Sequence, residues 1–238
     1  MKVLVNGFGI TDSGGVKVLD KFLTECVHSE ENHAFIIMLS SSERIERLAA
    51  KYKSHDFLSF QILKFNHYPH RFLYENWNFR TLVAQHEIDL IYNFSGSAQL
   101  FIDCPQLVKM HNLTFYSRRL DKFFKDSAQI VAWIRQVILK RLVFRLMLKK
   151  SDYIEIQSKH VNRCLDHFLS LEKKRLFIKS DVDVSDENFR APKEYDFSKK
   201  IKFLYIVGPH FFSANKNILD LANGMLSLSE YNVDFEIN

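Results

Sequence analysis

The sequence predicts an α/β protein built on a doubly wound parallel sheet. Short apolar runs of strand length alternate with longer stretches whose apolar residues recur at helical spacing. The composition suits a folded core, because 47% of the 238 residues are hydrophobic and only 7 are glycine and 4 proline. A βα series of this kind winds through right-handed crossovers, and its ligands bind outside the carboxyl ends of the strands.

The expected elements alternate from the N-terminus. Strands are expected where apolar runs are short and continuous, at residues 3–5, 34–39, 57–63, 88–94, 106–110, 152–157 and 175–179. Helices are expected where apolar residues share one face, at residues 18–27, 41–52, 71–85, 128–149 and 161–168. A serine before residue 43 is a typical N-cap for the second helix.

The chain is expected to divide into a domain of residues 1–189, a linker of residues 190–200 and a further segment of residues 201–238. The linker has scattered charges, no clear period and a proline. A strand from Ile201, a helix from about Asn215 and a last strand make one βαβ unit. One such unit cannot cover both faces of a parallel sheet. It either joins the first sheet or, as we predict, begins an incomplete second domain.

The cysteines and the apolar runs predict a cytoplasmic protein. Cys26, Cys104 and Cys164 are odd in number and widely separated, which is not a disulfide framework, and no Cys/His spacing indicates zinc. The N-terminus is too short and too rich in glycine for a signal peptide, and no apolar run approaches the ~20 residues that cross a bilayer.

A glycine-containing loop follows the first strand. The dinucleotide fingerprint G-x-G-x-x-G fits Gly7 and Gly9, but Asp12 stands where the third glycine belongs. Gly14 and Gly15 come later, where the first helix begins. Free N–H groups and the helix dipole at that position suit an anion. The alternative is a flexible first turn without a ligand.

Two further positions carry candidate chemistry. His111 and Asn112 follow the strand at 106–110, at the ligand-binding edge, where a histidine can donate to a hydroxyl or phosphate. Lys216 opens a helix after a strand, which is a natural place for a diphosphate clamp. The alternatives are a loop histidine bonded to the backbone and an ordinary solvated lysine.

Basic residues are concentrated between Ser117 and Lys150. Ten basic and two acidic residues there leave +8, so the remainder of the +5 chain carries about −3. An apolar helical face with cationic flanks is typical of an interfacial helix on anionic lipid. A core-packed helix with a wet basic side is the alternative, and no nucleic-acid motif accompanies the charge. The expected membrane-docking residues are Arg118, Arg119, Lys122, Trp133, Lys140 and Arg141.

Four stretches in order, "SGGVKVL", "PQLVKMHN", "SDYIEIQSKHV" and "FLYIVG…NKNILDL", resemble a known family. They are similar to the retaining, nucleotide-sugar-dependent glycosyltransferases of the GT-B fold, family-four type. The likeness spans nearly the whole chain, as a Rossmann-like acceptor-side domain and the first βαβ unit of a donor-side domain. It implies a nucleotide-sugar substrate and a lipid-linked or cell-surface glycan acceptor, as in polysaccharide or lipopolysaccharide biosynthesis.

The resemblance implies roles for named residues. Gly14, Gly15 and Lys216 would bind the donor diphosphate, and His111 would lie near the transferred sugar as a catalytic residue. Ser13 and Asn112 would contact the acceptor. No metal cofactor and no nucleic-acid partner are expected. The protein would be cytoplasmic, with a peripheral position on the cytoplasmic face of a membrane.

The chain departs from the family in two places. Gly208, Pro209 and His210 replace the usual Gly-Arg pair, and the chain ends before the acidic pair that holds the donor's sugar and ribose. We therefore expect this chain alone to be inactive, and a form with a complete second domain to transfer sugar. A non-catalytic binding or regulatory fragment and a GT-B sugar-nucleotide epimerase are the alternatives.

Overall fold

The computed structural model describes residues 1–10, 13–65, 67–94, 96–110, 121, 130–169, 176–179, 201–203, 218–230 and 235–237. The chain forms two compact units. One comprises Met1–Ser117 and Ile134–Asp181, and the other comprises Arg118–Trp133 and Val182–Asn238.

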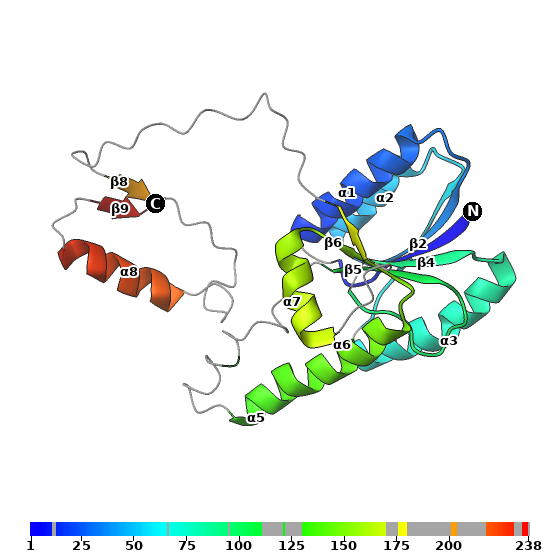
Figure 1. Ribbon diagram of the computed structural model, residues 1–238. Helices are drawn as coiled ribbons and strands as arrows, with labels where there is room; N and C mark the ends of the chain where they lie inside the picture. The colour runs from blue at the N-terminus through cyan, green and yellow to red at the C-terminus, as the bar shows by residue number, and fades with distance from the viewer. Residues whose placement is uncertain are drawn as a thin grey trace. The chain divides into compact units, whose positions relative to one another are not determined.

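A seven-stranded sheet forms the centre of the first unit (Figure 1). Its strands are β1 (Lys2–Gly7), β2 (Ala34–Ser40), β3 (Leu58–Leu63), β4 (Leu90–Asn93), β5 (Gln106–Met110), β6 (Tyr153–Ile156) and β7 (Leu176–Ile178). They lie in the order β3-β2-β1-β4-β5-β6-β7, and every neighbouring pair is parallel. The order reverses between β1 and β4, as in Rossmann-type folds, so the predicted fold class is confirmed.

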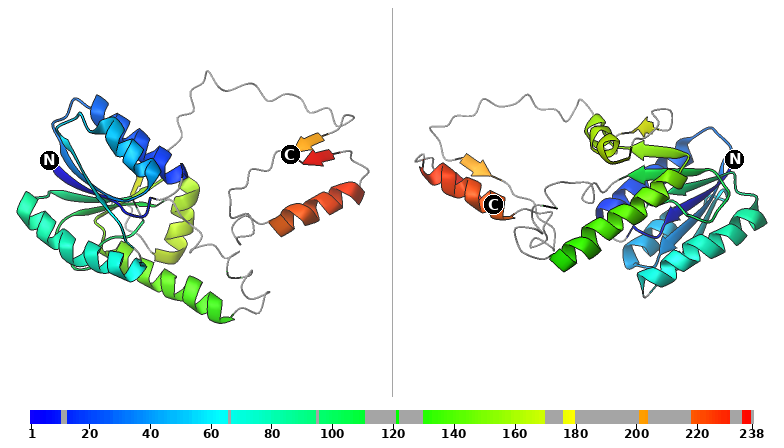
Figure 2. Two further views of the ribbon diagram at one scale, coloured as in Figure 1. Left: turned by 180° about the vertical axis from the view of Figure 1, so that it is seen from behind. Right: turned by 60° about the horizontal axis from the view of Figure 1, so that its bottom comes forward.

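Helices cover the sheet on both faces (Figures 1 and 2). Helices α1 (Ser13–His28) and α2 (Glu43–Tyr52) share a core cluster with β1, β2 and β3. Helix α3 (Tyr68–His86) packs against the other face of β1 and β4. Helices α6 (Leu139–Lys150) and α7 (Lys159–Leu169) share a third cluster with β5 and β6. This arrangement follows from right-handed crossovers in both directions from β1.

The alternation of side chains along each strand divides the core. Val3 and Val5 belong to the cluster under α1, whereas Leu4, between them, belongs to the cluster under α3. On β5 and β6, Lys109 and Glu155 are partners in register, and both side chains are buried. The Lys109 ammonium pairs with Glu155 Oε1, and the Tyr92 hydroxyl donates to Glu155 Oε2 at 2.6 Å. A charged pair of neighbouring strands is therefore buried against one face of the sheet.

The helix expected at 128–149 is found over its described part, from Ile130 to Lys150. It consists of α5 (Ile130–Trp133), a π-helical segment (Ile134–Ile138) and α6. The π segment was not predicted, because apolar spacing of three to four residues does not distinguish it from α-helix. Among the described residues, no helix is both long and apolar enough to cross a bilayer.

The second unit contains the expected βαβ elements. Strands β8 (Ile201–Phe203) and β9 (Phe235–Ile237) pair in parallel, and α8 (Ile218–Glu230) lies between them in sequence. These two strands make a sheet of their own. The boundaries proposed above for the two domains and their linker stay a prediction.

Candidate functional site

The carboxyl ends of β1 and β4 form the point where the sheet reverses its order. From β1 the chain continues toward β2, and from β4 it continues toward β5 on the other side. In open α/β sheets the loops that leave such a point in opposite directions create the ligand-binding crevice. The loop after Gly7 and the loop after Asn93 are the loops that leave it here. This edge is the candidate site.

The N-terminus of α1 lies at this edge. Helix α1 begins at Ser13, so Gly14 and Gly15 occupy its first turn, as the sequence predicts. Gly14 is exposed, and the first turn contains no acidic residue that would compete with an anion. The first turn of a helix presents backbone N–H groups and the positive end of the helix dipole, and both features suit an anion such as a phosphate. The binding roles of Ser13, Gly14 and Gly15 stay predictions.

Gly7 serves packing at the end of β1. A Cβ atom at this position would lie 2.5 Å from Leu39 Cδ2 and 3.3 Å from the Met38 carbonyl oxygen. The chain turns directly afterwards, with the Ile10 N–H donating to the Gly7 carbonyl at 2.9 Å. A larger residue at Gly7 would therefore require the Leu39 side chain to move and the Met38 carbonyl to shift by a few tenths of an ångström.

A group of buried amide side chains lies beneath the two loops. Asn6 Nδ2 donates to Asn93 Oδ1 at 3.1 Å, and Gln99 Nε2 donates to the same oxygen at 2.9 Å. Asn93 Nδ2 in turn donates to Gln106 Oε1 at 3.2 Å. All four residues are at most 1% exposed. Hydrogen bonds between buried amides stabilise such a network in a core and favour one arrangement of the backbone.

The same amides hold the backbone of both loops. The Phe8 N–H donates to Asn6 Oδ1 at 3.4 Å, and the Gln99 N–H donates to Gln106 Oε1 at 2.8 Å. Gln106 Nε2 returns a hydrogen bond to the Gln99 carbonyl at 2.8 Å. Gly96 has a φ of +76°, a conformation that favours glycine. Gln99 Oε1 has no hydrogen-bond partner in the part of the chain that the structure describes.

We call Asn6, Asn93, Gln99 and Gln106 the amide network. A buried carboxylate on α3 extends it. Glu75 is 4% exposed, accepts from Arg71 Nε at 2.5 Å and interacts with the Asn6 side chain. Burial raises the pKa of the Glu75 carboxyl, and the Arg71 charge opposes that rise. An ion pair therefore lies next to the neutral amides at the carboxyl ends of β1 and β4.

Sequence reasoning missed the amide network. The available signal was a polar residue at the end of an apolar run, as in "VLVN" and "LIYN". These patterns are also typical of a strand that simply ends in a loop. Which asparagines face one another depends on strand order, which the sequence did not reveal.

Most of the other predicted site residues lie outside the described part of the chain. This holds for His111, Asn112, Lys216, Arg118, Arg119 and Lys122. Strand β5 ends at Met110, the residue before His111 in the sequence. Trp133 is described, and its Nε1 donates to Asp121 Oδ1 at 2.9 Å. On α6, Lys140 is exposed and Arg141 is partly exposed.

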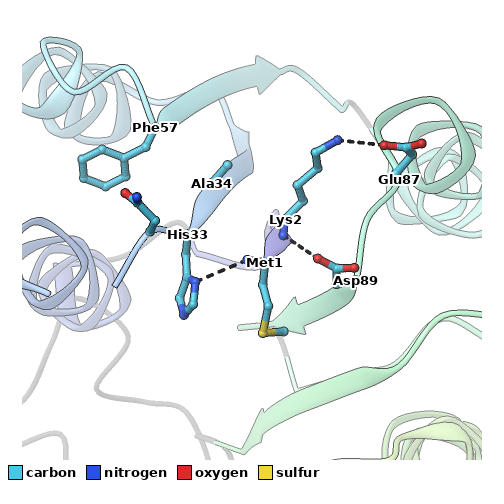
Figure 3. Close-up of a pocket in the computed structure, with 8 residues that line it drawn as sticks. Met1, Lys2, His33, Ala34, Phe57, Glu87 and Asp89 are labelled. Carbon is cyan, nitrogen blue, oxygen red and sulfur yellow. Dashed lines mark hydrogen bonds and ion pairs between the residues drawn. The ribbon is translucent and has the colours of Figure 1, made fainter. Parts of the chain in front are cut away.

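A cavity of about 520 Å³ opens at the opposite edge of the sheet (Figure 3). It is lined by Met1, Lys2, Asn32, His33, Ala34, Phe57, Glu87 and Asp89. Lys2 Nζ pairs with Glu87 Oε2 at 3.1 Å, and the Lys2 N–H donates to Asp89 Oδ2 at 2.8 Å. These two contacts join the amino ends of β1 and β4, and the charged side chains of Lys2, Glu87 and Asp89 take part in them. Because ligands of parallel sheets bind at carboxyl ends, we do not place the functional site here.

No group of three or more His, Cys, Asp or Glu residues within the described ranges has the geometry to hold a metal ion.

Comparisons with known proteins give limited likenesses. No family model and no curated protein matches the chain. One similar solved structure is a glycosyltransferase from Rickettsia africae ESF-5, at 11% identity and a TM-score of 0.43, covering 75% of this chain and 42% of that chain. Another is the yeast methylglyoxal/isovaleraldehyde reductase Gre2 complexed with NADPH, at 12% identity and a TM-score of 0.30, covering all of this chain and 56% of that chain.

Neither likeness identifies a family. Both TM-scores are below 0.5, and the chain spans about half the length of each of these proteins. The fold class therefore follows from the order and direction of the strands.

Proposed function

We propose that the chain is the acceptor-side domain and the beginning of the donor-side domain of a nucleotide-sugar-dependent glycosyltransferase. The observation that carries the proposal is the edge at which β1 and β4 end, where the first turn of α1 contains Gly14 and Gly15. The N-terminus of a helix at a strand-order reversal suits the diphosphate of a sugar nucleotide, because the positive end of the helix dipole faces the ligand. The four sequence stretches that resemble retaining GT-B enzymes of the family-four type add support.

In this proposal the leaving diphosphate is stabilised without a bound metal. Lys216 supplies a positive charge, and the N–H groups of Gly14 and Gly15 supply neutral donors. His111 follows β5 directly in the sequence and would contact the transferred sugar. Ser13 and Asn112 would bind the acceptor, which is a lipid-linked or cell-surface glycan. Peripheral attachment to the cytoplasmic face of a membrane would bring the crevice to such an acceptor.

The amide network has a supporting role in this proposal. It keeps the loops after β1 and β4 in one arrangement, because Asn6 and Gln106 accept hydrogen bonds from N–H groups of these loops. A crevice that is preorganised in this way binds its ligand without the cost of ordering the loops.

Binding at the crevice is tested by NMR titration of the chain with UDP, GDP and ADP. Amide shifts of Gly14 and Gly15 should change with at least one nucleotide, and Gly14→Asp should weaken that binding by charge repulsion. Gly224→Asp, on α8, is the matched control, because its position is exposed and nothing lies near its Cβ. Unchanged shifts at Gly14 and Gly15 with all three nucleotides would remove the diphosphate assignment.

Transfer is tested on a form of the protein with a complete second domain, by release of nucleoside diphosphate from a panel of sugar nucleotides. Lys216→Ala should lower the rate by roughly ten- to a hundredfold, because a charge-assisted hydrogen bond contributes about 1.5–3 kcal/mol. His111→Ala should lower turnover without unfolding the protein. Wild-type rates in both variants would refute the site. Interconversion of sugar nucleotides without an acceptor would indicate an epimerase, and nucleotide binding without turnover would indicate a binding fragment.

A further inference from the structure

Helix α6 has apolar residues on two faces, and only one of them is covered. Met147 and Leu148 are buried, and Val143 packs against the same core cluster. The other face continues into the π-helical segment before α6 and contains a row of residues that are 39–55% exposed. We call this row the α6 ridge: Ile134 and Ile138 of the π-helical segment and Leu139, Leu142 and Leu146 of α6. A surface helix of a soluble domain normally has polar residues on the face away from the core. The α6 ridge is therefore an apolar surface that lacks a cover in the described part of the chain.

The ridge is continuous along the helix. Ile138, Leu142 and Leu146 are four residues apart, and Leu139 is three residues before Leu142, so these side chains lie on neighbouring turns of one face. From residue 138 to residue 146 the α-helix extends about 12 Å, and the ridge continues into the π-helical segment before it. Figure 1 shows α6 at the outer surface of its side of the sheet, and the right-hand view of Figure 2 agrees. Ordinary protein surfaces expose single leucines, whereas the α6 ridge joins several exposed apolar side chains into one patch.

Positive charge surrounds the ridge. Residues 134–150 contain no acidic residue and six basic ones, namely Arg135, Lys140, Arg141, Arg145, Lys149 and Lys150. Arg145 follows Leu142 by three residues, and Lys149 follows Leu146 by three, so these exposed cations border the ridge. The partner of this face must therefore accept apolar side chains at its centre and cations at its edges.

Two other partners fit this pattern poorly. A two-fold contact between copies of this chain would place the ridge on itself, but it would also bring Arg145 and Lys149 close to the same cations of the second copy. A nucleic acid would accept the cations and leave the leucines in water. An anionic bilayer accepts both, because its phosphates lie above its acyl chains.

We propose that the outer face of α6 binds an anionic lipid bilayer, with the α6 ridge at the acyl boundary and Arg145, Lys149 and Lys150 on the headgroup phosphates. The helix then lies in the plane of the membrane. The proposal deepens the membrane location named under the proposed function by assigning the binding surface. It is measured as lipid binding without any transfer assay, so either proposal can fail while the other stands.

The test is co-sedimentation of the full chain with vesicles of phosphatidylcholine alone and of phosphatidylcholine mixed with phosphatidylglycerol, at low and high salt. The protein should bind only the mixed vesicles, and salt should weaken the binding. Replacing Leu139, Leu142 and Leu146 by Gln should lower the apparent affinity by roughly tenfold or more, because the ridge no longer enters the acyl boundary. These side chains are exposed, so the variant should keep its circular dichroism spectrum and its melting temperature.

Two control variants distinguish binding through the α6 ridge from non-specific adsorption to the vesicles. Leu226→Gln removes a leucine of α8 that is even more exposed, at 66%, and Arg44→Gln with Lys53→Gln removes two exposed cations from the α2 region. Both should bind as the wild type does, whereas Arg145→Gln with Lys149→Gln should bind more weakly. The proposal is overturned if the wild type ignores anionic vesicles at low salt, or if the triple Gln variant binds them unchanged. A dimer in sedimentation velocity that the triple variant abolishes would assign the ridge to a second copy instead.

Discussion

Asn6 and Asn93 join the two strands at which the sheet reverses its order, with Asn6 Nδ2 3.1 Å from Asn93 Oδ1. Both side chains are fully buried, and they are partners in the register of β1 and β4. Each is also linked to the backbone of a crevice loop, Asn6 through the Phe8 N–H and Asn93 through Gln106. The relationship therefore couples the position of the two loops to the pairing of the two central strands.

Asn93→Leu should destabilise the first unit by about 2–5 kcal/mol. The leucine removes the acceptor of Asn6 and Gln99 and the donor to Gln106, and each buried polar group left unpaired costs about 1–3 kcal/mol. Urea unfolding measures the loss, and hydrogen exchange at the Gln99 N–H should accelerate. Asn32→Leu, at an exposed position of the opposite edge, is the control and should change little. Equal stability of Asn93→Leu and the wild type would show that the network does not hold the crevice.

Lys109→Met should cost about 3–5 kcal/mol, because it leaves the buried Glu155 carboxylate without its charged partner. Adding Glu155→Gln should restore most of this loss, since the glutamine is neutral and still accepts from the Tyr92 hydroxyl. Chemical denaturation of the two single variants and the double variant gives the coupling energy. Additive effects of the two substitutions would contradict the pairing.

Arg71→Met should destabilise the protein by about 3 kcal/mol at neutral pH, and the loss should shrink as the pH falls. Burial raises the pKa of the Glu75 carboxyl above its ordinary value of 4.5, so the folded protein binds this proton more tightly than the unfolded chain. Protonated Glu75 therefore contributes to the free energy of unfolding. This contribution is complete below pH 4.5 and is lost as the pH rises through the pKa of Glu75 in the folded protein. Urea unfolding between pH 4.5 and pH 8 measures the slope. In the variant Arg71→Met with Glu75→Gln, the part of the slope that Glu75 contributes should disappear.

Cys26 and Cys104 should react slowly with iodoacetamide in the folded protein. Burial, with a smaller contribution from the neighbouring Glu25, raises the pKa of the Cys26 thiol to about 12, and burial raises that of Cys104 to about 11. Because the thiolate is the nucleophile, only a very small fraction of either thiol is reactive at pH 8. Mass spectrometry of each cysteine with and without urea measures the protection. Labelling of Cys26 at the same rate in both conditions would contradict the raised pKa of its thiol.

Much of the secondary structure was predictable from local pattern. The strand expected at 34–39 is β2 (Ala34–Ser40), and the serine expected to cap the second helix is Ser42, whose hydroxyl accepts from the Ile45 N–H. The glycines expected at the start of the first helix lie in the first turn of α1. Apolar periodicity, capping and glycine placement act over a few neighbouring residues, so the sequence expresses them directly.

The amide network required the tertiary structure. Asn6 and Asn93 are 87 residues apart, and nothing in either local pattern indicates the other. They meet because β1 pairs with β4, and that pairing depends on the strand order of the whole sheet. The same holds for Lys109 and Glu155, which are 46 residues apart and become neighbours in register only when β5 pairs with β6.

The long basic helix shows in one element what the local sequence determines and what tertiary packing decides. Its sequence alone predicted a helix over residues 128–149 that is cationic and rich in apolar residues, and the described part of this helix runs from Ile130 to Lys150. Which apolar residues face water was decided by packing, because Met147 and Leu148 fit the core under β5 and β6 while Leu142 and Leu146 point away from it. Periodicity determines that a helix has faces, and only the contacts of the folded chain determine which face is buried.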